Sequence, residues 1–314
     1  MESNTATMAG TMLTRDLVGA EGSLVAARGD VVDLQLLRDV AAGAPTNLRQ
    51  RALHQTEFAD AVLAAMDAPA LGYICGSPET RGRVADVLAE VRFPDAIWTE
   101  LEALKKEDPN RLQHGLWTAV TAARMFGAAL DDAPGLSRLV GGAMVHDIGM
   151  RYCAPRLRWK REHLSRAEAM ALQDHPIMGA LVLARWLGDV PAVHFALLHH
   201  ARAGQGYPKL QGAVPLRGLD VVSVASAFAA MCAPRSFRAT PFNPRGACDQ
   251  LLDEAKAGRF DARAVRLLIH CLRGGSGPLQ QLPLPKRATG FRPSQNCHGA
   301  GGPVAAAVAA ARAG

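Results

Sequence analysis

Apolar residues recur at helical spacing along most of the chain from about residue 78 onward. Hydrophobic positions three and four residues apart form a stripe on one face of a helix, so this pattern predicts a mostly α-helical body. Ser77-Pro78 places proline at a first helical position, and Ser165 to Glu168 forms a capping box. The helices are expected at 78–92, 95–106, 110–130, 136–145, 166–173, 176–187, 190–200, 217–232, 246–256 and 261–272.

The two ends of the chain depart from this pattern. Residues 1–50 contain short β-type runs broken by Gly22 and Gly29, which predict a small β-rich N-terminal element. Residues 51–94 are expected to form a helical connector that includes a short helix at 57–66, and 95–273 the helical body. Residues 274–314 are rich in glycine and proline and predict an irregular tail.

Composition limits the class of protein. Of the 314 residues 49% are hydrophobic and 5% aromatic, so the core must consist mainly of alanine, leucine and valine. No apolar run approaches the roughly 18 residues that span a bilayer. The first ten residues lack the basic-then-apolar layout of a signal peptide. We therefore expect a cytoplasmic protein without membrane insertion.

The charge of the chain bears on its partners. Lysine and arginine number 35 against 29 acids, a net charge of +6, which favours an anionic ligand such as a nucleotide or phosphate ester. No basic block with interleaved aromatics occurs, so DNA is not expected as a partner. The six cysteines are scattered without a C-x-x-C pair and are interpreted as reduced thiols.

Histidines concentrate in one part of the sequence. Seven of the ten lie between positions 114 and 200, and histidine is the commonest metal-ligating side chain. His163, in a charged run, and His194, on a different helix face from His199, are interpreted as structural. The other histidines of this segment are candidate ligands: His114, His146, His175, His199 and His200.

Three local settings favour metal chemistry. His146-Asp147 ends an apolar helix, His175 stands at a helix start, and His199-His200 closes a further helix. A carboxylate beside a histidine can bridge two ions about 3.5–4 Å apart while imidazoles complete each shell, as in two-metal phosphoester hydrolysis. The pattern predicts two divalent ions, and iron, manganese or zinc suits such ligands.

These residues resemble the HD-GYP family, a branch of the HD superfamily of metal-dependent phosphohydrolases. The family pattern is a first histidine, then HDIGK, a His-Pro, and His-His followed by a GYP loop. This chain has His114, HDIGM at 146–150, DHPIMGA at 174–180, HH at 199–200 and GQGYP at 204–208, in the same order. The resemblance covers about residues 95–240 and implies an HD-type helical bundle that cleaves cyclic di-GMP.

The resemblance also implies a role for each matching position. The metal ligands would be His114, His146, Asp147, His175, His199 and His200, and the catalytic Asp147 would bridge the two ions. Gly206, Tyr207 and Pro208 match a loop that shapes a guanine pocket. Arg235 and Arg238 match a basic stretch near the substrate phosphates.

Several positions depart from the family pattern. Met150 replaces the lysine of HDIGK, which removes a cation directed at phosphate. The loop before GYP is one residue shorter and has Ala201 in place of glutamate. Ser226 and Ala229 stand where the family has two aspartates, and Asn110 where three-metal members have glutamate. A hydroxyl is a poor replacement for an anionic ligand, so these changes weaken the expected metal shell.

Three functions remain open from the sequence. The first is a metal-dependent phosphodiesterase acting on cyclic di-GMP or a related phosphoester. The second is a catalytically impaired domain that binds a nucleotide or a partner and signals without turnover. The third is a helical interaction domain with incidental histidines. The N-terminal element is a candidate site for a protein partner in any of them.

Overall fold

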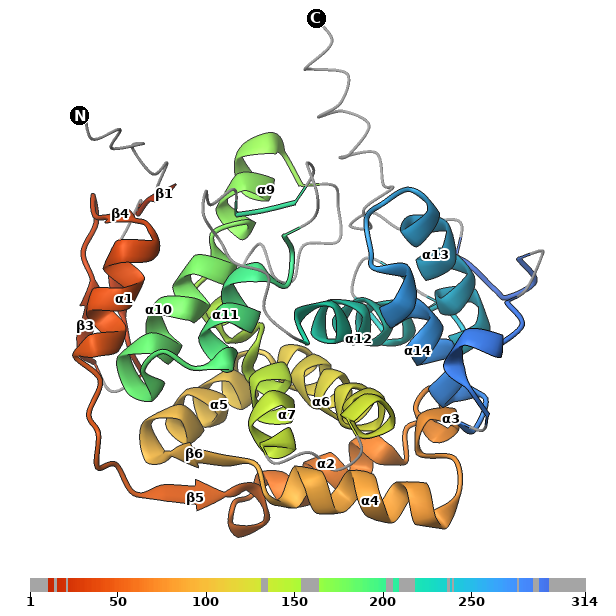
Figure 1. The fold of residues 1–314 in the computed structure, drawn as a ribbon. Helices are drawn as coiled ribbons and strands as arrows, with labels where there is room; N and C mark the ends of the chain where they lie inside the picture. The colour runs from red at the N-terminus through yellow and green to blue at the C-terminus, as the bar shows by residue number, and fades with distance from the viewer. Residues whose placement is uncertain are drawn as a thin grey trace, which may run out of the picture.

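The computed structural model describes residues 11–13, 16–20, 22–130, 135–153, 164–201, 206–208, 218–235, 238, 240–275, 277–284 and 288–293. These residues are mostly helical, with a small β element near the N-terminus (Figure 1), which confirms the predicted fold class. Predictions for His163, the turn at 132–134, the loop at 202–205 and the end of the tail from 294 lie outside the described residues.

Two short strand pairs and one helix make up the N-terminal element, as predicted. Asp33 caps the helix by accepting a hydrogen bond from the backbone N–H of Leu36. The element packs on helix α10 (His175–Leu187) through α1 and β3, and it exposes Met12 and Leu24 on its outer side. Its parts are β1 (Thr11–Met12) paired antiparallel with β4 (Val31–Val32), β2 (Leu17–Val18) paired with β3 (Leu24–Ala26), and α1 (Leu34–Ala42).

The connector contains a ribbon that the periodicity did not predict. The helix expected at 78–92 ends at Ala89, because residues 92–94 form a strand instead. The buried indole of Trp98 donates to the carbonyl of Phe93 and holds the ribbon against the body. The connector comprises β5 (Gln50–Ala52) antiparallel to β6 (Arg92–Pro94), η1 (Leu53–Gln55), α2 (Phe58–Met66), α3 (Gly72–Cys75) and α4 (Pro78–Ala89).

The helical body follows the predicted ranges closely. Both predicted caps form: Ser77 accepts from Thr80 N, and Ser165 and Glu168 bond reciprocally. The helix expected at 246–256 begins two residues earlier, where Asn243 caps it. The elements are α5 (Asp95–Glu107), α6 (Pro109–Leu130), α7 (Leu136–Val145), η2 (Ile148–Tyr152), α9 (Arg166–Leu172), α10, α11 (Pro191–Leu198), α12 (Leu219–Cys232), α13 (Pro244–Lys256), α14 (Ala262–Leu272) and η3 (Leu279–Gln281).

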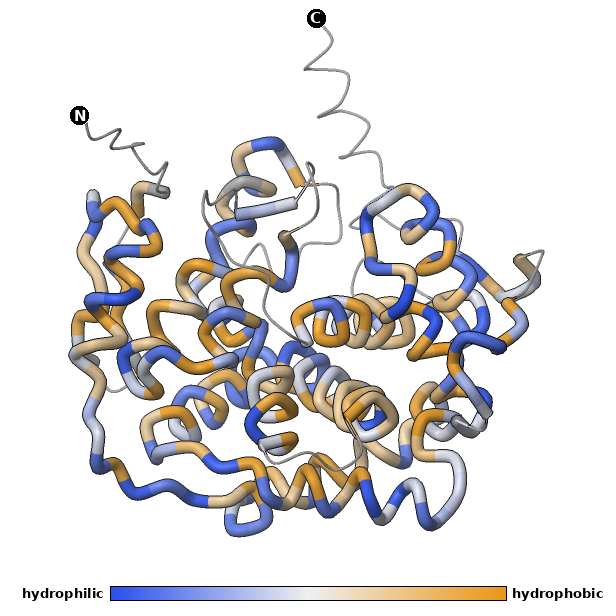
Figure 2. Tube along the Cα trace, in the orientation of Figure 1, coloured by the Kyte–Doolittle hydropathy of each residue, from blue (hydrophilic) through white to orange (hydrophobic). Residues whose placement is uncertain are grey.

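Helix α6 is the central element of the body. It packs against α2, α4, α5, α7, α12 and α14, and nearly every side chain from Leu112 to Phe126 is buried. Its small residues let neighbouring helices approach closely. Figure 2 shows hydrophobic colouring along much of α10, α11 and α12, whereas the outer β5 segment is hydrophilic. The core thus lies between α6 and the helices that carry the candidate ligands.

A buried carboxylate joins the N-terminal element to this body. Glu100 on α5 is fully buried and accepts hydrogen bonds from the Tyr152 hydroxyl at 2.7 Å and from Arg151 at 3.1 Å. Its other oxygen accepts from the backbone N–H of Ala20 at 2.6 Å. Because η2 follows directly after Asp147, these bonds fix the segment on which the candidate site depends.

The described part of the tail contains the short helix η3 and is firmly attached to the body at its end. Asp249 on α13 accepts hydrogen bonds at 2.8 Å from the backbone N–H groups of Thr289 and Gly290. Arg292 pairs with Asp253 at 2.9 Å. Residues 288–293 therefore form a strap across α13.

Glycines set the closest approaches between the ligand-bearing elements. A Cβ added at Gly149 would lie 1.9 Å from the carbonyl oxygen of His175 and 2.5 Å from the nitrogen of Gly179. A Cβ at Gly115 would lie 2.5 Å from the Met144 carbonyl oxygen. Backbone atoms cannot give way as side-chain ends can, so a larger residue would separate η2 from α10, or α6 from α7.

We predict that Gly149→Ala lowers the free energy of unfolding by about 1–3 kcal/mol, because the added methyl group would overlap the backbone atoms of His175 and Gly179. Gly127→Ala is the matched control. Gly127 lies on α6 with open space around its Cα, so alanine should be neutral or stabilise by up to about 1 kcal/mol. Urea unfolding measures both, and wild-type stability in Gly149→Ala would contradict the close approach.

Candidate metal centre

The six predicted ligand residues come together in one buried cluster. His114 lies on α6, His146 and Asp147 at the end of α7, His175 at the start of α10, and His199 and His200 after α11. Neighbouring rings pack with centroids 4.1–5.3 Å apart. Apart from His200, which is half-buried, each is at most 5% exposed.

Helix ends orient three of the imidazoles in the same way. The Nδ1–H groups of His146, His175 and His199 donate to the carbonyl three residues earlier, at 2.7, 2.7 and 2.8 Å. A carbonyl only accepts, so each Nδ1 carries a hydrogen, and in the neutral ring the lone pair is on Nε2. A carbonyl that holds Nδ1 and leaves Nε2 free is the usual support of a metal-ligating histidine.

The inward-facing atoms form two groups that could each hold a metal ion. In each group the candidate ligand atoms lie within 4.8 Å of one another. The groups are His114, His146 and Asp147, and His175, His199 and His200. Asp147 lies between them, since its Oδ1 is 3.1 Å from His175 Nε2 and its Oδ2 is 3.8 Å from His114 Nε2.

The electrostatics favour neutral imidazoles around one carboxylate. Burial lowers the pKa of His146, and it lowers the pKa of His114 and His199 well below the usual histidine value. Burial alone would raise the pKa of Asp147, but the Arg111 guanidinium together with the neighbouring His175 and His146 outweighs it and holds that pKa well below its usual range. Neutral imidazoles and an ionised carboxylate are the forms that bind a metal ion.

One oxygen of that carboxylate is left without a hydrogen bond. Asp147 Oδ1 is buried and accepts none from the part of the chain that the structure describes. The nearby His175 Nε2 bears a lone pair when that ring is neutral, so two electron-rich atoms face each other at 3.1 Å. A cation between them would satisfy both, and the residues therefore fit a metal ion.

Arg111 is a neighbour of the site that the sequence analysis missed. Its Nη1 donates to Asp147 Oδ2 at 2.9 Å. It precedes His114 by three residues on α6, and this spacing puts both side chains on the same helix face. This i, i+3 spacing from a candidate ligand is the signal for Arg111 that the sequence itself carries.

Ser226, where the HD-GYP resemblance leads us to expect an aspartate, lies beside two of the candidate ligands. Its Oγ lies 3.0 Å from His146 Nε2 and 3.3 Å from His114 Nε2, and it comes from the middle of α12. Because His146 carries its hydrogen on Nδ1, its Nε2 accepts a hydrogen bond from the Ser226 hydroxyl. The hydroxyl oxygen accepts in turn from His114 Nε2 when that nitrogen carries the hydrogen of the ring. A neutral group thus bridges the two histidines.

Tyr207 packs against the other end of the cluster. Its ring stacks on His200 with centroids 4.7 Å apart, and its backbone N–H donates to the His200 carbonyl at 3.2 Å. The Tyr207–Pro208 peptide is cis, and Gly206 lies beside it. These residues border the site, while their contact with a guanine stays a prediction.

The two arginines predicted near substrate phosphates differ in their surroundings. Arg235 lies close enough to the cluster to lower the pKa of His114, and burial and Arg111 lower its own pKa. Arg238 is buried and donates to the carbonyls of Ala230 and Ala233 near the end of α12. The Arg238 guanidinium thus holds the chain after α12, and its contact with substrate stays a prediction.

Met150 and His194 are two further residues that the sequence analysis singled out. Met150, where the resemblance leads us to expect a lysine, is 2% exposed and is part of the core. His194 bonds Asp189 at 2.7 Å and belongs to neither group of candidate ligands, consistent with its interpretation as structural.

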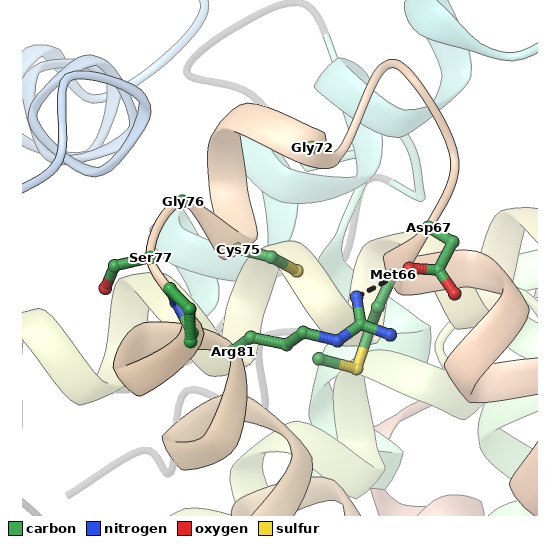
Figure 3. A pocket seen from close by; sticks show the side chains of 8 residues that line it. Met66, Asp67, Gly72, Cys75, Gly76, Ser77 and Arg81 are labelled. Atoms are coloured by element: carbon green, nitrogen blue, oxygen red, sulfur yellow. Dashed lines mark ion pairs between the residues drawn. The ribbon is translucent and has the colours of Figure 1, made fainter.

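An open pocket elsewhere in the chain is a weaker candidate. It lies where α2, α3 and α4 meet (Figure 3), and Arg81 and Asp67 neutralise each other there at 2.8 Å. Burial raises the pKa of the Cys75 thiol, which therefore stays protonated and a poor nucleophile. The lining residues are Met66, Asp67, Gly72, Cys75, Gly76, Ser77, Pro78 and Arg81.

Comparison with known proteins does not identify the chain: no protein-family model matches it, and no curated protein gives a match. Among the described helices, none is both long enough and apolar enough to cross a membrane. The chemistry of the site must therefore be argued from its own residues.

We predict that the metal-free protein loses stability in mild acid. His114 and His199 stay neutral when folded but take up protons when unfolded, so their contribution is complete above about pH 6.5 and is lost as the pH falls. Between pH 6.5 and 5.5 these two histidines should cost about 2 kcal/mol, roughly 1 for each, and His146, whose pKa burial also lowers, adds to the loss.

Urea unfolding at the two pH values in the presence of a chelator measures this loss. His114→Gln removes one of these histidines and should reduce the difference by about 1 kcal/mol. Equal stability at both pH values in the wild-type chain would show that these histidines are not held neutral.

Proposed function

We propose that this chain is a metal-dependent phosphodiesterase of the HD-GYP type, which hydrolyses cyclic di-GMP or a related phosphoester. The observation that carries the proposal is the convergence of imidazole Nε2 atoms on a carboxylate oxygen that has no hydrogen bond in the described structure. The ordered match of His114, HDIGM, His-Pro, His-His and GYP to the family supports the same reading.

Each part of the cluster has a role in this proposal. The two groups would take up to two divalent ions, with iron, manganese or zinc suited to their histidine and carboxylate donors. When bound, such ions activate water and stabilise charge on a phosphoryl group. Asp147 lies between the groups, and the helix-end carbonyls hold the imidazoles in the tautomer that binds metal.

The charges around the cluster support an anionic substrate. Arg111 and Arg235 bring two guanidinium groups near the carboxylate of Asp147. Arginine stays protonated at neutral pH even where its pKa is lowered. The net charge of +6 on the whole chain acts in the same direction. A phosphodiester fits this field, and Tyr207 beside His200 offers an aromatic face to a base.

A second function is favoured by one specific observation. Arg111 and Ser226 already engage inward atoms of the His114 group, which weakens a two-ion centre. The alternative is a catalytically impaired domain that binds a nucleotide or partner and signals without turnover. The two readings share the same site and differ only in whether product forms.

We expect protein purified without chelator, under reducing and low-oxygen conditions, to convert cyclic di-GMP to a linear dinucleotide or GMP in added Mn²⁺ or Fe²⁺. Asp147→Asn should lower both the metal content and the rate by more than about 100-fold, the upper range for residues that only support a ligand. His194→Gln, outside the cluster, is the control and should retain both.

Chromatography of the products and elemental analysis of the protein read out the two quantities. Bound nucleotide without product would favour the signalling alternative. Full metal content in Asp147→Asn would contradict the placement of the site.

A further inference from the structure

The two candidate metal-binding groups of the cluster differ in the hydrogen bonds that the Asp147 oxygen beside each of them already makes. In the His114 group, Asp147 Oδ2 accepts a hydrogen bond from Arg111 at 2.9 Å. The Nε2 atoms of His114 and His146 both lie within hydrogen-bond distance of the Ser226 hydroxyl. All three side chains of this group thus have a partner supplied by the protein.

The Arg111 guanidinium is well placed to act as a permanent cation. Its side chain is 19% exposed and that of Asp147 is 7% exposed, so little water screens the pair. Charge-assisted hydrogen bonds of this kind are roughly twice as strong as neutral ones. Arg235 adds a second positive charge beside it. A divalent ion in the same group would have to displace Arg111 or lie against both guanidinium groups.

Beside the His175 group, the carboxylate of Asp147 presents an oxygen that has no hydrogen bond in the described structure. Asp147 Oδ1 accepts no hydrogen bond from any described residue, and it lies 3.1 Å from His175 Nε2 and 3.9 Å from His199 Nε2. The two Nε2 atoms are 3.3 Å apart. Donors that surround one ion tetrahedrally at about 2.0–2.2 Å lie about 3.3–3.6 Å from one another. The observed spacings are close to those of a single coordination shell.

We infer that the cluster binds one divalent ion, held by His175, His199, His200 and Asp147 Oδ1, and that Arg111 takes the place of a second ion. The inference rests on the proposed function only in expecting a metal ion at this site. It assigns a positioning role to Arg111, which neutralises Oδ2 of the carboxylate while Oδ1 remains open to the ion.

Titration of the chelator-treated full chain with Mn²⁺ tests the inference directly. Calorimetry should give about one ion per chain, and electron paramagnetic resonance should show isolated Mn²⁺ instead of an exchange-coupled pair. The double variant Arg111→Met with Ser226→Asp removes the competing cation and adds an anionic ligand, so it should bind a second ion. Arg138→Met, an exposed arginine on α7, should stay at one.

Single substitutions locate the ion. His200→Ala should weaken Mn²⁺ binding by more than about 10-fold, whereas His114→Gln should change it less than about threefold; loss of a supporting group alone costs roughly 10- to 100-fold. Circular dichroism and thermal unfolding confirm that each variant folds. If a histidine variant does not fold, the calorimetric stoichiometry and the resonance spectrum of the wild-type chain still decide the number of ions.

The outcomes separate this inference from the proposed function. Two tightly bound, coupled ions in the wild-type chain would overturn the inference, even if cyclic di-GMP is hydrolysed. Loss of the ion in His114→Gln with retention in His200→Ala would also overturn it. One ion without hydrolysis supports the inference and contradicts the phosphodiesterase proposal.

Discussion

The candidate site depends on one buried charge, the carboxylate of Asp147. A buried carboxylate is costly unless cations or hydrogen-bond donors compensate it. Arg111 on α6 compensates one oxygen, and the other faces His175 at the start of α10. Because these partners come from different helices, the carboxylate couples the packing of α6, α7 and α10. The same packing buries His114 and His199, and this burial lowers their pKa values.

Small residues make this packing possible. Gly149 allows η2 to approach α10, and Gly115 allows α6 to approach α7, at distances where a Cβ would overlap a carbonyl oxygen. The approach puts helix ends next to one another, and helix ends carry carbonyls without intrahelical partners. Those carbonyls take up the Nδ1–H groups of His146 and His175 and turn Nε2 inward. Backbone geometry thus supplies the tautomers that metal binding needs.

The balance between metal and arginine determines which function is chemically available. A centre with two ions requires anionic ligands, yet Asp147 is the carboxylate that lies within the cluster, and Ser226 is neutral. Arg111 already contributes positive charge beside that carboxylate. A phosphodiesterase with one ion and a resident guanidinium, and a binding domain without turnover, are both compatible with this charge arrangement, and product formation separates them.

Helical periodicity and capping residues were sufficient to predict the body, since local interactions set where α4 and α9 begin. The order of His146, Asp147 and His175 likewise indicated a metal site before any geometry was known. The β5–β6 ribbon was missed because strand pairing joins residues about 40 positions apart, which no local pattern records. The contact of Arg111 with Asp147 and the bridging position of the Ser226 hydroxyl join residues far apart in the sequence, so only the tertiary structure shows them. The sequence by itself determined which metal-ligating side chains are present. Tertiary packing decided which of their atoms has a hydrogen-bond partner in the described structure, as Asp147 Oδ2 does, and which has none, as Asp147 Oδ1.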